Sequence, residues 1–569
     1  MLAAGCILVG GCSTAPDAST SRTDTHDGSV TVETTAFSSL RRLTPSVDLT
    51  EGGAPPTLMA ARGEREGFQV VAWADRGSPR LVVLTGSLRG PGDARISARH
   101  VKAYIEQPMT VDRGSPAGRR GIYVDPLVPA AHRDVVLGPT NRLLMWVDVA
   151  VPVGATPGSY AGTVELRTST KRGQAAEGPD GLLASVPVRV VVRAATLPDT
   201  PTLASSIGVD ASQIERFEHV AAGSPELRAA TEHYARTLAD ARLSIADVGV
   251  LPPGTLPGHT SAVGDAAYLE RVFGRRGVAS VRIPFYMDYP FADPLGTDRP
   301  AALAYLRRAA AWAQKHGWLD RAYVYAIDEP DDSRAGEVRE LHELVHAANP
   351  KLRLLVTREA SATAFAGSVD IWTPNINATR FRRSDVVRQA RAGRATWWYP
   401  SVTTFQPQPT LFIDELRPTP RALGWLAWRM GVRGILYWSA THWHDVEDPY
   451  HDTATFRETD VVGNGDGVLL YPGAPIGRPG LPSPSIRLLQ LRDGIEDHDL
   501  LTLATCHGSA ADRVRLQRLA ALVAPSMTHV VPTPVQVQAL RSAAFATLDR
   551  AVRAKRYVAG STAAACAAR

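Results

Sequence analysis

The sequence predicts a TIM-type (β/α)8 barrel of the α/β class, preceded by an all-β sandwich and followed by a helical segment. Three patterns indicate this order. Short apolar-alternating runs broken by Gly and Pro occupy 37–200, eight strand-like segments alternate with helical ones within 201–480, and helical patterns fill most of 481–569 before a loose tail. Eight β-α units in about 240 residues fit the size of a TIM barrel.

The composition is that of an ordinary globular protein. Of 569 residues, 44% are hydrophobic and 21% are charged, which excludes a largely disordered chain. The net charge of +5 is small and the charges are scattered, so we expect no nucleic-acid partner. Four cysteines in this length exclude a disulfide scaffold. Export would permit Cys506 and Cys566 to pair, and two free thiols are the alternative.

An apolar run of small residues, MLAAGCILVGGC, opens the sequence and ends at Cys12. It resembles the lipobox of a bacterial lipoprotein signal, in which this cysteine carries the lipid. No Lys or Arg precedes the run, so we expect the true translation start to lie upstream. Residues 13–36 are rich in Ser, Thr, Asp and Gly, and we interpret 1–36 as a signal followed by a flexible tether. These features predict a protein on the extracellular face of the bacterial cell membrane, attached only through its lipid. A secreted protein without the lipid is the alternative.

The first domain reads as a sandwich because its strand-like runs are short and separated by turn signals. These runs are 68–74, 80–88, 100–107, 142–151, 162–169 and 184–194. No carboxylate pair or metal-ligand cluster stands out among them. We therefore expect this domain to support the next one or to position a large substrate.

The second domain shows the alternation expected of a barrel. Its strand candidates are 204–210, 244–250, 278–287, 322–328, 352–358, 369–374, 396–402 and 434–440. Helical patterns lie between them, and the segment 418–431 has Pro near its start and Gly at its end, as helix caps do. A doubly wound sheet is the alternative, but the sequence has no GxGxxG or GxxxxGK[ST] turn. We expect no nucleotide and no other cofactor.

Acidic and aromatic residues gather where the predicted barrel strands end, which is where barrel enzymes carry their chemistry. The fourth strand ends in Asp328 and Glu329, the predicted catalytic pair. The other strand ends supply the predicted substrate-binding residues Asp288, Trp372, Asn375, Tyr399, Trp438 and Trp443. Carboxylates ringed by aromatic faces suggest a sugar site, because aromatic rings stack on the apolar face of a pyranose.

The adjacent pair suggests how a glycosidic bond would be broken. Such a bond needs an acid on the leaving oxygen and a nucleophile at the anomeric carbon. The seventh strand, 396–402, carries no carboxylate, which argues against the common use of two separate carboxylates. If the sugar has a 2-acetamido group, its own carbonyl oxygen can attack. Glu329 would then act as general acid/base, Asp328 would orient and stabilise the acetamido group, and Tyr399 is expected to hydrogen-bond its carbonyl oxygen.

Seven motifs resemble the catalytic region of glycoside hydrolase family 123, in that family's order, and cover roughly 200–505. They are YAIDEPDD (325–332), VDIWTPN (369–375), WWYPS (397–401), GILYWSATHW (434–443), DPY (448–450), NGDGVLLYPG (464–473) and PSPSIRLLQLRDGIEDHDLL (482–501). The resemblance implies a β-N-acetylgalactosaminidase that works by substrate assistance and acts on a glycan or glycoconjugate. It places the family's Asp-Glu pair on Asp328 and Glu329. It does not tell which hexosamine or linkage is cleaved.

Two other functions stay open at this point. One is a barrel glycosidase that acts on a sugar without an acetamido group and uses Glu359 or Asp288 as nucleophile. The other is a lipoprotein that binds glycans without cleaving them.

Three further segments have ordinary structural interpretations. The run 441–452 gathers His442, His444, Asp445, Asp448 and His451, but we interpret it as a pocket wall and expect no metal site. The segment 463–467, GNGDG, reads as a turn. The charged helical segment that begins near 485 is expected to pack on the barrel with ion pairs on its flank.

Overall fold

The computed structural model describes residues 30–74, 76–137, 142–171, 173–246, 271, 279–377, 381–404, 407–458 and 460–557. Cys12, Cys566 and most of the expected second barrel strand, 244–250, lie outside these residues. Cys506 is disulfide-bonded. Its pairing with Cys566 stays a prediction.

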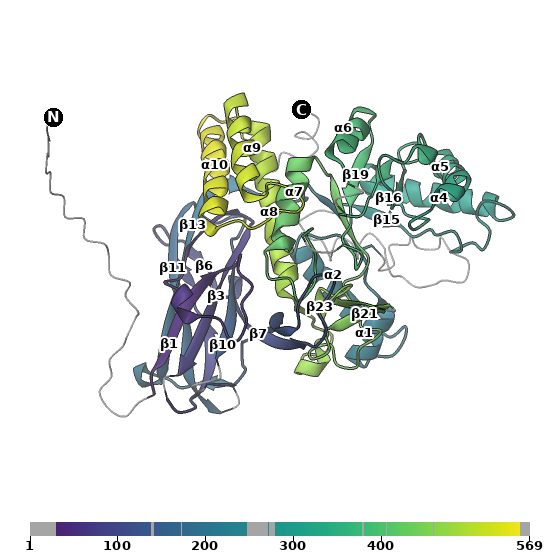
Figure 1. Cartoon of the computed structure of the whole chain (residues 1–569). Coiled ribbons are helices and arrows are strands. Elements are labelled where there is room, and N and C mark those ends of the chain that lie inside the picture. Colours follow the sequence, from purple (N-terminus) through teal and green to yellow (C-terminus); the bar gives the residue numbers. More distant parts are fainter. Residues whose placement is uncertain are drawn as a thin grey trace, which may run out of the picture.

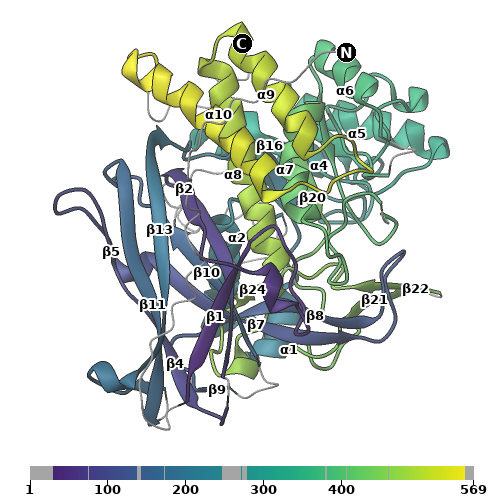
Figure 2. The same ribbon diagram turned by 60° about the vertical axis from the view of Figure 1, so that its left-hand side comes forward.

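The N-terminal region consists of two packed β-sheets (Figures 1 and 2). The first sheet has the order β1 (Val32–Ser38), β3 (Arg65–Ala74), β10 (Leu143–Ala150), β7 (Val101–Val111) and β8 (Gly121–Pro129). The second has the order β2 (Thr57–Arg62), β13 (Leu182–Thr196), β11 (Gly158–Lys171), β4 (Arg80–Thr85) and β9 (Val135–Val136), with β5 (Leu88–Arg89), β6 (Arg95–Ile96) and β12 (Gln174–Ala175) beside it. Apolar residues of both sheets form one core. Strand β1 begins at Val32, inside the segment that the sequence predicted to be tether.

The middle of the chain contains seven parallel strands in a nearly closed, barrel-like sheet. Their order is β14 (Ala204–Ile207), β20 (Gly434–Tyr437), β19 (Ala395–Trp398), β18 (Ile371–Trp372), β17 (Arg353–Val356), β16 (Ala322–Val324) and β15 (Val281–Ile283). At the place of the predicted second strand, Ile245 forms a parallel bridge with Ile207. The sequence predicted eight strands, and the described residues form seven plus this bridge.

Helices surround the sheet and continue beyond it. They are α1 (Ala211–Glu218), α2 (Pro225–Asp240), α4 (Arg299–Lys315), α5 (Ala335–Ala348), α6 (Arg383–Arg391), α7 (Thr419–Met430), α8 (Ile486–His507), α9 (Ala510–Val523) and α10 (Pro534–Arg553). As its sequence predicted, α7 has Pro420 in its first turn and ends at Gly431, whose φ of +80° is the left-handed cap that glycine favours. The short strands β21 (Ala454–Glu458), β22 (Val461–Asn464), β23 (Leu470–Tyr471) and β24 (Ser483–Pro484) follow the last barrel strand.

Successive residues of the barrel strands face opposite sides of the sheet. One set fills the barrel, where the rings of Tyr323 and Trp397 meet with centroids 5.3 Å apart. The other set, which includes Trp372 and Trp398, belongs to the core between the sheet and the helices. This alternation decides which aromatic residues can reach the active site.

Helix α8 runs between the sandwich and the barrel, and it is buried on all sides from Ile486 to Leu501 (Figure 1). Its charged side chains are therefore not on a flank, as the sequence suggested, but inside the protein. Arg487 pairs with Asp125 of β8 at 2.8 Å, and Arg492 pairs with Asp148 of β10 at 2.8 Å.

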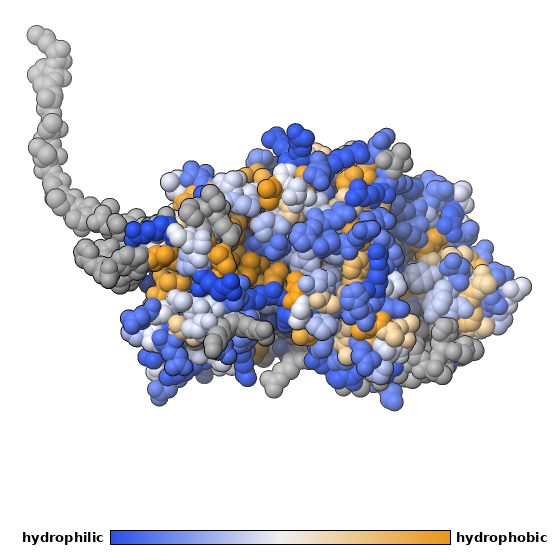
Figure 3. Space-filling model, turned by 90° about the horizontal axis from the view of Figure 1, so that it is seen from below, coloured by the Kyte–Doolittle hydropathy of each residue, from blue (hydrophilic) through white to orange (hydrophobic). Residues whose placement is uncertain are grey.

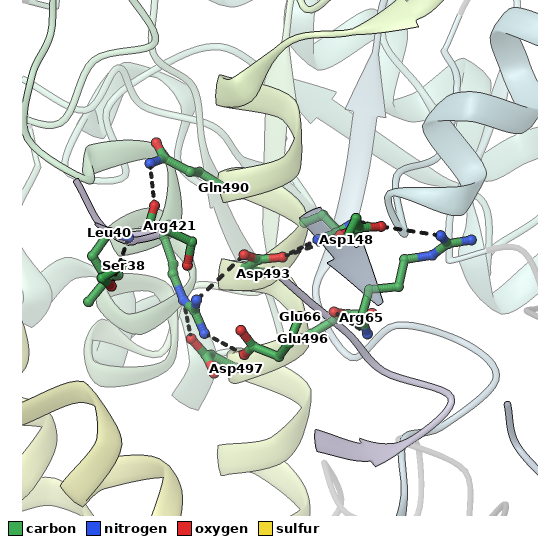
Figure 4. Close-up of polar contacts among 12 residues, drawn as sticks. Ser38, Leu40, Arg65, Glu66, Asp148, Arg421, Gln490, Asp493, Glu496 and Asp497 are labelled. Carbon is green, nitrogen blue, oxygen red and sulfur yellow. Dashed lines mark hydrogen bonds and ion pairs between the residues drawn. The ribbon is translucent and has the colours of Figure 1, made fainter. Parts of the chain in front are cut away.

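A neighbouring group of ion pairs links α7, α8 and the sandwich (Figure 4). Arg421 of α7 contacts Glu66 of β3 at 2.9 Å, Asp497 at 2.8 Å and Asp493 at 3.5 Å. Arg541 of α10 contacts Glu64 at 2.7 Å. The sandwich and the barrel are thus joined by buried charge as well as by apolar contact.

In the part of the chain that the structure describes, no helix is both long and apolar enough to cross a bilayer. Seen from below, hydrophilic residues cover most of the molecule and apolar ones are scattered among them (Figure 3).

We predict that Arg487→Met strongly destabilises the protein, because it leaves the Asp125 carboxylate buried without its main partner. Breaking a buried pair in this way costs about 3–5 kcal/mol. The midpoint of urea-induced unfolding would measure the loss. The matched control is Arg236→Met, which removes a half-exposed pair with Glu232 and should cost under about 1 kcal/mol. Equal losses in the two variants would contradict the prediction.

Candidate active site

A pocket of about 480 Å³ lies at the carboxyl ends of the barrel strands, and Asp328 and Glu329 both line it. Its walls come from loops after several strands. Other lining residues include Arg282, Tyr286, Tyr325, Thr357, Tyr399, Ser401, Thr403, Tyr437, Trp438, Phe456 and Asp466. A larger cavity of about 820 Å³ lies between the sandwich and the barrel, but it shares no lining residue with this pocket.

The backbone at Glu329 explains how two consecutive side chains can enter one pocket. Neighbouring residues in an extended chain point to opposite sides. Glu329 has φ +38°, in the left-handed region that a residue with a Cβ seldom adopts, so the alternation is broken at this position. The Glu329 N–H donates a 2.7 Å hydrogen bond to Thr357 Oγ1, which holds the turn in place.

Asp328 is held by two hydroxyl groups. Tyr325 donates to Asp328 Oδ1 at 2.5 Å and Thr357 donates to the same oxygen at 2.9 Å. Burial and the nearby Asp328 carboxylate raise the pKa of the Tyr325 phenol well above its usual value. Tyr325 therefore keeps its proton and remains a donor.

Glu329 accepts a hydrogen bond on Oε1 from the hydroxyl of Tyr399. Burial, followed by the hydrogen bond and charge of Glu329, raises the pKa of Tyr399 above its ordinary range, so this phenol also stays protonated. The sequence predicted Tyr399 in the site, with its hydroxyl on the substrate amide. In the structure that hydroxyl contacts Glu329.

Trp438 and Asp466 form another part of the wall. Asp466 lies in the GNGDG turn between Gly465 and Gly467, whose φ values of +72° suit glycine. Tyr437 donates to Asp466 Oδ1 at 3.1 Å and accepts from the Gly467 N–H at 2.8 Å. Burial raises the pKa of Asp466 to about 6. The predicted turn is present. It also brings Asp466 to the pocket, which the sequence did not predict. The only sequence signal for Asp466 was its place in the NGDG motif.

Four of the six predicted substrate-binding residues do not line the pocket, namely Asp288, Trp372, Asn375 and Trp443. Trp372 faces the core outside the barrel, where it is 1% exposed. Trp443 is buried against Phe217 and Tyr234, with ring centroids 5.4 and 6.1 Å away. Asp288 is exposed and does not line the cavity. Trp372 was predicted from its place at a strand end, and a strand with apolar residues on both faces does not reveal its register. Trp443 follows the predicted eighth strand, and its place in the sequence does not show which way its ring points.

Asn375 lies behind the pocket and contacts residues that line it. Its amide donates to Ser401 Oγ at 3.0 Å and Thr403 Oγ1 at 3.2 Å, and both of these residues line the cavity. Its carbonyl oxygen accepts from Thr404 at 2.8 Å. Asn375 therefore positions the loop after β19 instead of lining the pocket itself.

Arg282 is a further pocket residue that the sequence analysis did not assign to the site. Its guanidinium lies over the rings of Tyr286 and Tyr325, 4.6 and 4.9 Å from their centroids. Arg282 lies in the middle of the predicted third strand, 278–287, and nothing in the local sequence indicates that it belongs to the site.

The sequence predicted that the loop 441–452 forms a wall of the pocket, but none of its residues lines the cavity. His442 packs on Trp438 with ring centroids 4.5 Å apart, so the loop backs the pocket wall. His444 pairs with Asp210 at 2.8 Å and His451 with Asp448 at 2.7 Å. Two groups of possible metal-binding side chains occur in the described part of the chain, and neither lines the pocket. One of them, Glu64 with Glu66 and Asp497, is already engaged by arginines.

The barrel region resembles known glycoside hydrolases. Residues 299–504 match the family model described as the glycoside hydrolase 123 catalytic domain. A solved structure of a family 123 glycoside hydrolase from Clostridium perfringens, studied for glycolipid glycan hydrolysis, has a TM-score of 0.63 at 13% identity and covers 92% of this chain and 99% of that one. The protein is a glycoside hydrolase. Residues 299–504 match the family 123 catalytic domain that the sequence motifs predicted.

Other solved structures are more distant. A Thermobacillus composti GH10 xylanase has a TM-score of 0.28 at 12% identity and covers 52% of this chain and 97% of that one. A Bifidobacterium dentium β-glucuronidase has a TM-score of 0.27 at 11% identity and covers 82% and 66%. No curated protein sequence matches this chain.

We predict that Asp466→Asn changes how stability depends on pH. The pKa of Asp466 is raised from 3.8 to about 6 in the folded state, so its stabilising contribution is complete below the unfolded pKa and is lost as pH rises through 6. The variant lacks this titration. Its stability relative to the wild type should rise by about 2–3 kcal/mol between about pH 4 and pH 7.

Urea unfolding at intervals across this pH range would measure the difference between the two proteins. Asp320→Asn is the control, because the Asp320 side chain is 82% exposed and its difference from the wild type should stay flat. A flat difference for Asp466→Asn would mean that Asp466 titrates normally.

Proposed function

We propose that this protein removes β-linked N-acetylhexosamine, GalNAc-like, from a glycan or glycoconjugate by substrate-assisted retaining catalysis. The observation that carries the proposal is the opening of Asp328 and Glu329 into one pocket. The two residues that could have served as a separate nucleophile, Glu359 and Asp288, do not line that pocket. The third pocket acid, Asp466, is 2% exposed and its Oδ1 accepts a hydrogen bond from Tyr437, so it is poorly placed to attack a sugar.

Asp328 is suited to orient the acetamido group. Tyr325 and Thr357 both donate to Oδ1, and no hydrogen bond from the described residues reaches Oδ2. Oδ2 can therefore accept a hydrogen bond from the acetamido N–H of a bound sugar. The carbonyl oxygen of that group then attacks the anomeric carbon, and the carboxylate stabilises the positive charge that develops on the oxazolinium ring.

Glu329 is suited to transfer the proton. Tyr399 donates to Oε1, and within the described residues Oε2 receives no hydrogen bond, so it is the oxygen that can carry a proton to the leaving group. After the leaving group departs, the same carboxylate takes a proton from the water that opens the oxazolinium ring. The anomeric configuration is retained because two inversions occur in sequence.

The remaining walls fit a pyranose. Trp438, Phe456 and Tyr286 offer ring surfaces, while Arg282 and Ser401 offer donors to hydroxyl groups. The glycolipid glycan hydrolysis named for the Clostridium perfringens protein supports a glycan substrate of this kind.

We predict that Asp328→Asn and Glu329→Gln both lose activity on an aryl β-N-acetylhexosaminide. Asp328→Asn removes one preorganised electrostatic partner, so we expect a fall in kcat of about 10²–10⁴-fold. Release of the aryl alcohol is the measurement. Wild type should cleave the 2-acetamido substrate and leave its 2-hydroxy analogue intact.

A thiazoline analogue of the oxazolinium intermediate provides the decisive control, since it should inhibit the wild type and bind Asp328→Asn more weakly. Cleavage of the 2-hydroxy sugar without thiazoline inhibition would favour a protein nucleophile. Binding of glycans with no turnover of any aryl glycoside would favour a non-catalytic lipoprotein.

The proposal includes attachment to the extracellular face of the bacterial membrane through Cys12. Its support is the apolar run of small residues that ends at this cysteine. We predict that cells expressing the full chain incorporate a labelled fatty acid into the protein and that Cys12→Ser abolishes the label. Cys6→Ser, a change within the same run, should keep it. Label in both variants would rule out Cys12 as the lipidated residue.

A further inference from the structure

Helix α5 carries two histidines one turn apart, in the sequence HELVH (342–346). Residues four apart lie on the same face of a helix, and the two imidazole rings have centroids 4.0 Å apart. Neither histidine belongs to a site that the sequence predicts, and the sequence predicts no metal site. Two histidines at this spacing on one helix are a common way to hold a zinc ion.

The third group comes from another element. Asp370 directly precedes β18, and its carboxylate lies 2.9 Å from His346 Nε2 and 3.6 Å from His342 Nε2. The ligand atoms of all three residues lie within 4.8 Å of one another. Bonds of 2.0–2.1 Å to a tetrahedral zinc ion require ligand atoms about 3.3 Å apart, so side-chain movements of about 1 Å or less are enough.

We propose that His342, His346 and Asp370 bind a Zn²⁺ ion on the outside of the barrel. Two imidazole nitrogens and one carboxylate oxygen form a ligand set that suits zinc and cobalt, whereas magnesium and calcium prefer oxygen ligands alone. Water completes the coordination, because the three side chains are 20%, 32% and 19% exposed and an ion can reach them from solvent.

The surroundings of Asp370 support this arrangement. The backbone N–H of Leu354, in β17, donates to Asp370 Oδ2 at 2.8 Å, so the carboxylate is oriented before any ion arrives. Arg353 of the same strand lies close enough to interact electrostatically with Asp370. This positive charge weakens the binding of a dication, so we expect an affinity below that of a closed site with four protein ligands.

The position in the fold indicates what the ion would do. Asp370 lies at the amino end of β18, whereas Asp328 and Glu329 follow the carboxyl end of β16. None of the three ligands lines the active-site pocket or the larger cavity between the sandwich and the barrel. The zinc ion would therefore link α5 to β17 and β18 and stabilise this part of the barrel, and it takes no part in glycoside hydrolysis.

The test uses the full chain without a histidine tag, stripped of metal with a chelator. Isothermal titration should show one Zn²⁺ site per chain, Co²⁺ should produce the visible absorption bands of a tetrahedral site, and Zn²⁺ should raise Tm while Mg²⁺ leaves it unchanged. His342→Gln and His346→Gln should each weaken Zn²⁺ binding by about 10–100-fold or more and abolish the rise in Tm.

The matched control is His451→Gln. His451 also pairs with an aspartate, at 2.7 Å, but it belongs to neither candidate metal group of the described residues. This variant should bind Zn²⁺ like the wild type, and all three variants should keep their activity on an aryl hexosaminide without added metal. Absence of a stoichiometric Zn²⁺ site in the wild type, or equal Zn²⁺ affinity in the wild type and both α5 variants, would overturn the proposal.

Discussion

The buried charge of helix α8 is the constraint on which the two halves of the molecule depend. Arg487 illustrates it. Its guanidinium pairs with Asp125 of the sandwich at 2.8 Å and donates to the carbonyl oxygens of Leu411 and Gly465 at 2.5 and 2.7 Å. Since Gly465 adjoins Asp466, one side chain connects the sandwich, the helix and the wall of the active site. A buried ion recovers its desolvation cost only when its partners are well placed, so each part of this assembly fixes the others.

In the network of buried ion pairs around Arg421, carboxyl groups outnumber guanidinium groups. This excess of acids affects which carboxyl groups are protonated. Six acids face four arginines in this network. The arginines are Arg65, Arg421, Arg492 and Arg541, and the acids are Glu64, Glu66, Asp148, Asp493, Glu496 and Asp497. Burial raises the pKa of Glu64, Asp493 and Glu496, whereas the arginines hold that of Asp497 below its usual value. Some of these acids therefore keep their protons near neutral pH, and the network avoids an excess of negative charge in the interior.

The sequence predicted the parts of the site that follow from local pattern. Asp328 and Glu329 could be found because they end a strand in a recognisable motif, and Gly431 because helix ends favour glycine. Trp372 was assigned wrongly because apolar residues on both faces of a buried strand hide its register. Helix α8 was misjudged because charged residues normally indicate a solvent-exposed face. Their partners, such as Asp125, lie hundreds of residues away, and no local periodicity reveals such pairs.

Helix α8 also limits how this enzyme could have been assembled in evolution. A barrel that acquired a different N-terminal module would leave Arg487 and Arg492 facing a surface without Asp125 and Asp148. Uncompensated cations inside a new interface would oppose its formation. Recombination between relatives should therefore exchange the N-terminal sandwich together with helices α8, α9 and α10. Phylogenetic trees built from these two segments should agree with each other more closely than either agrees with a tree built from the loops around the pocket.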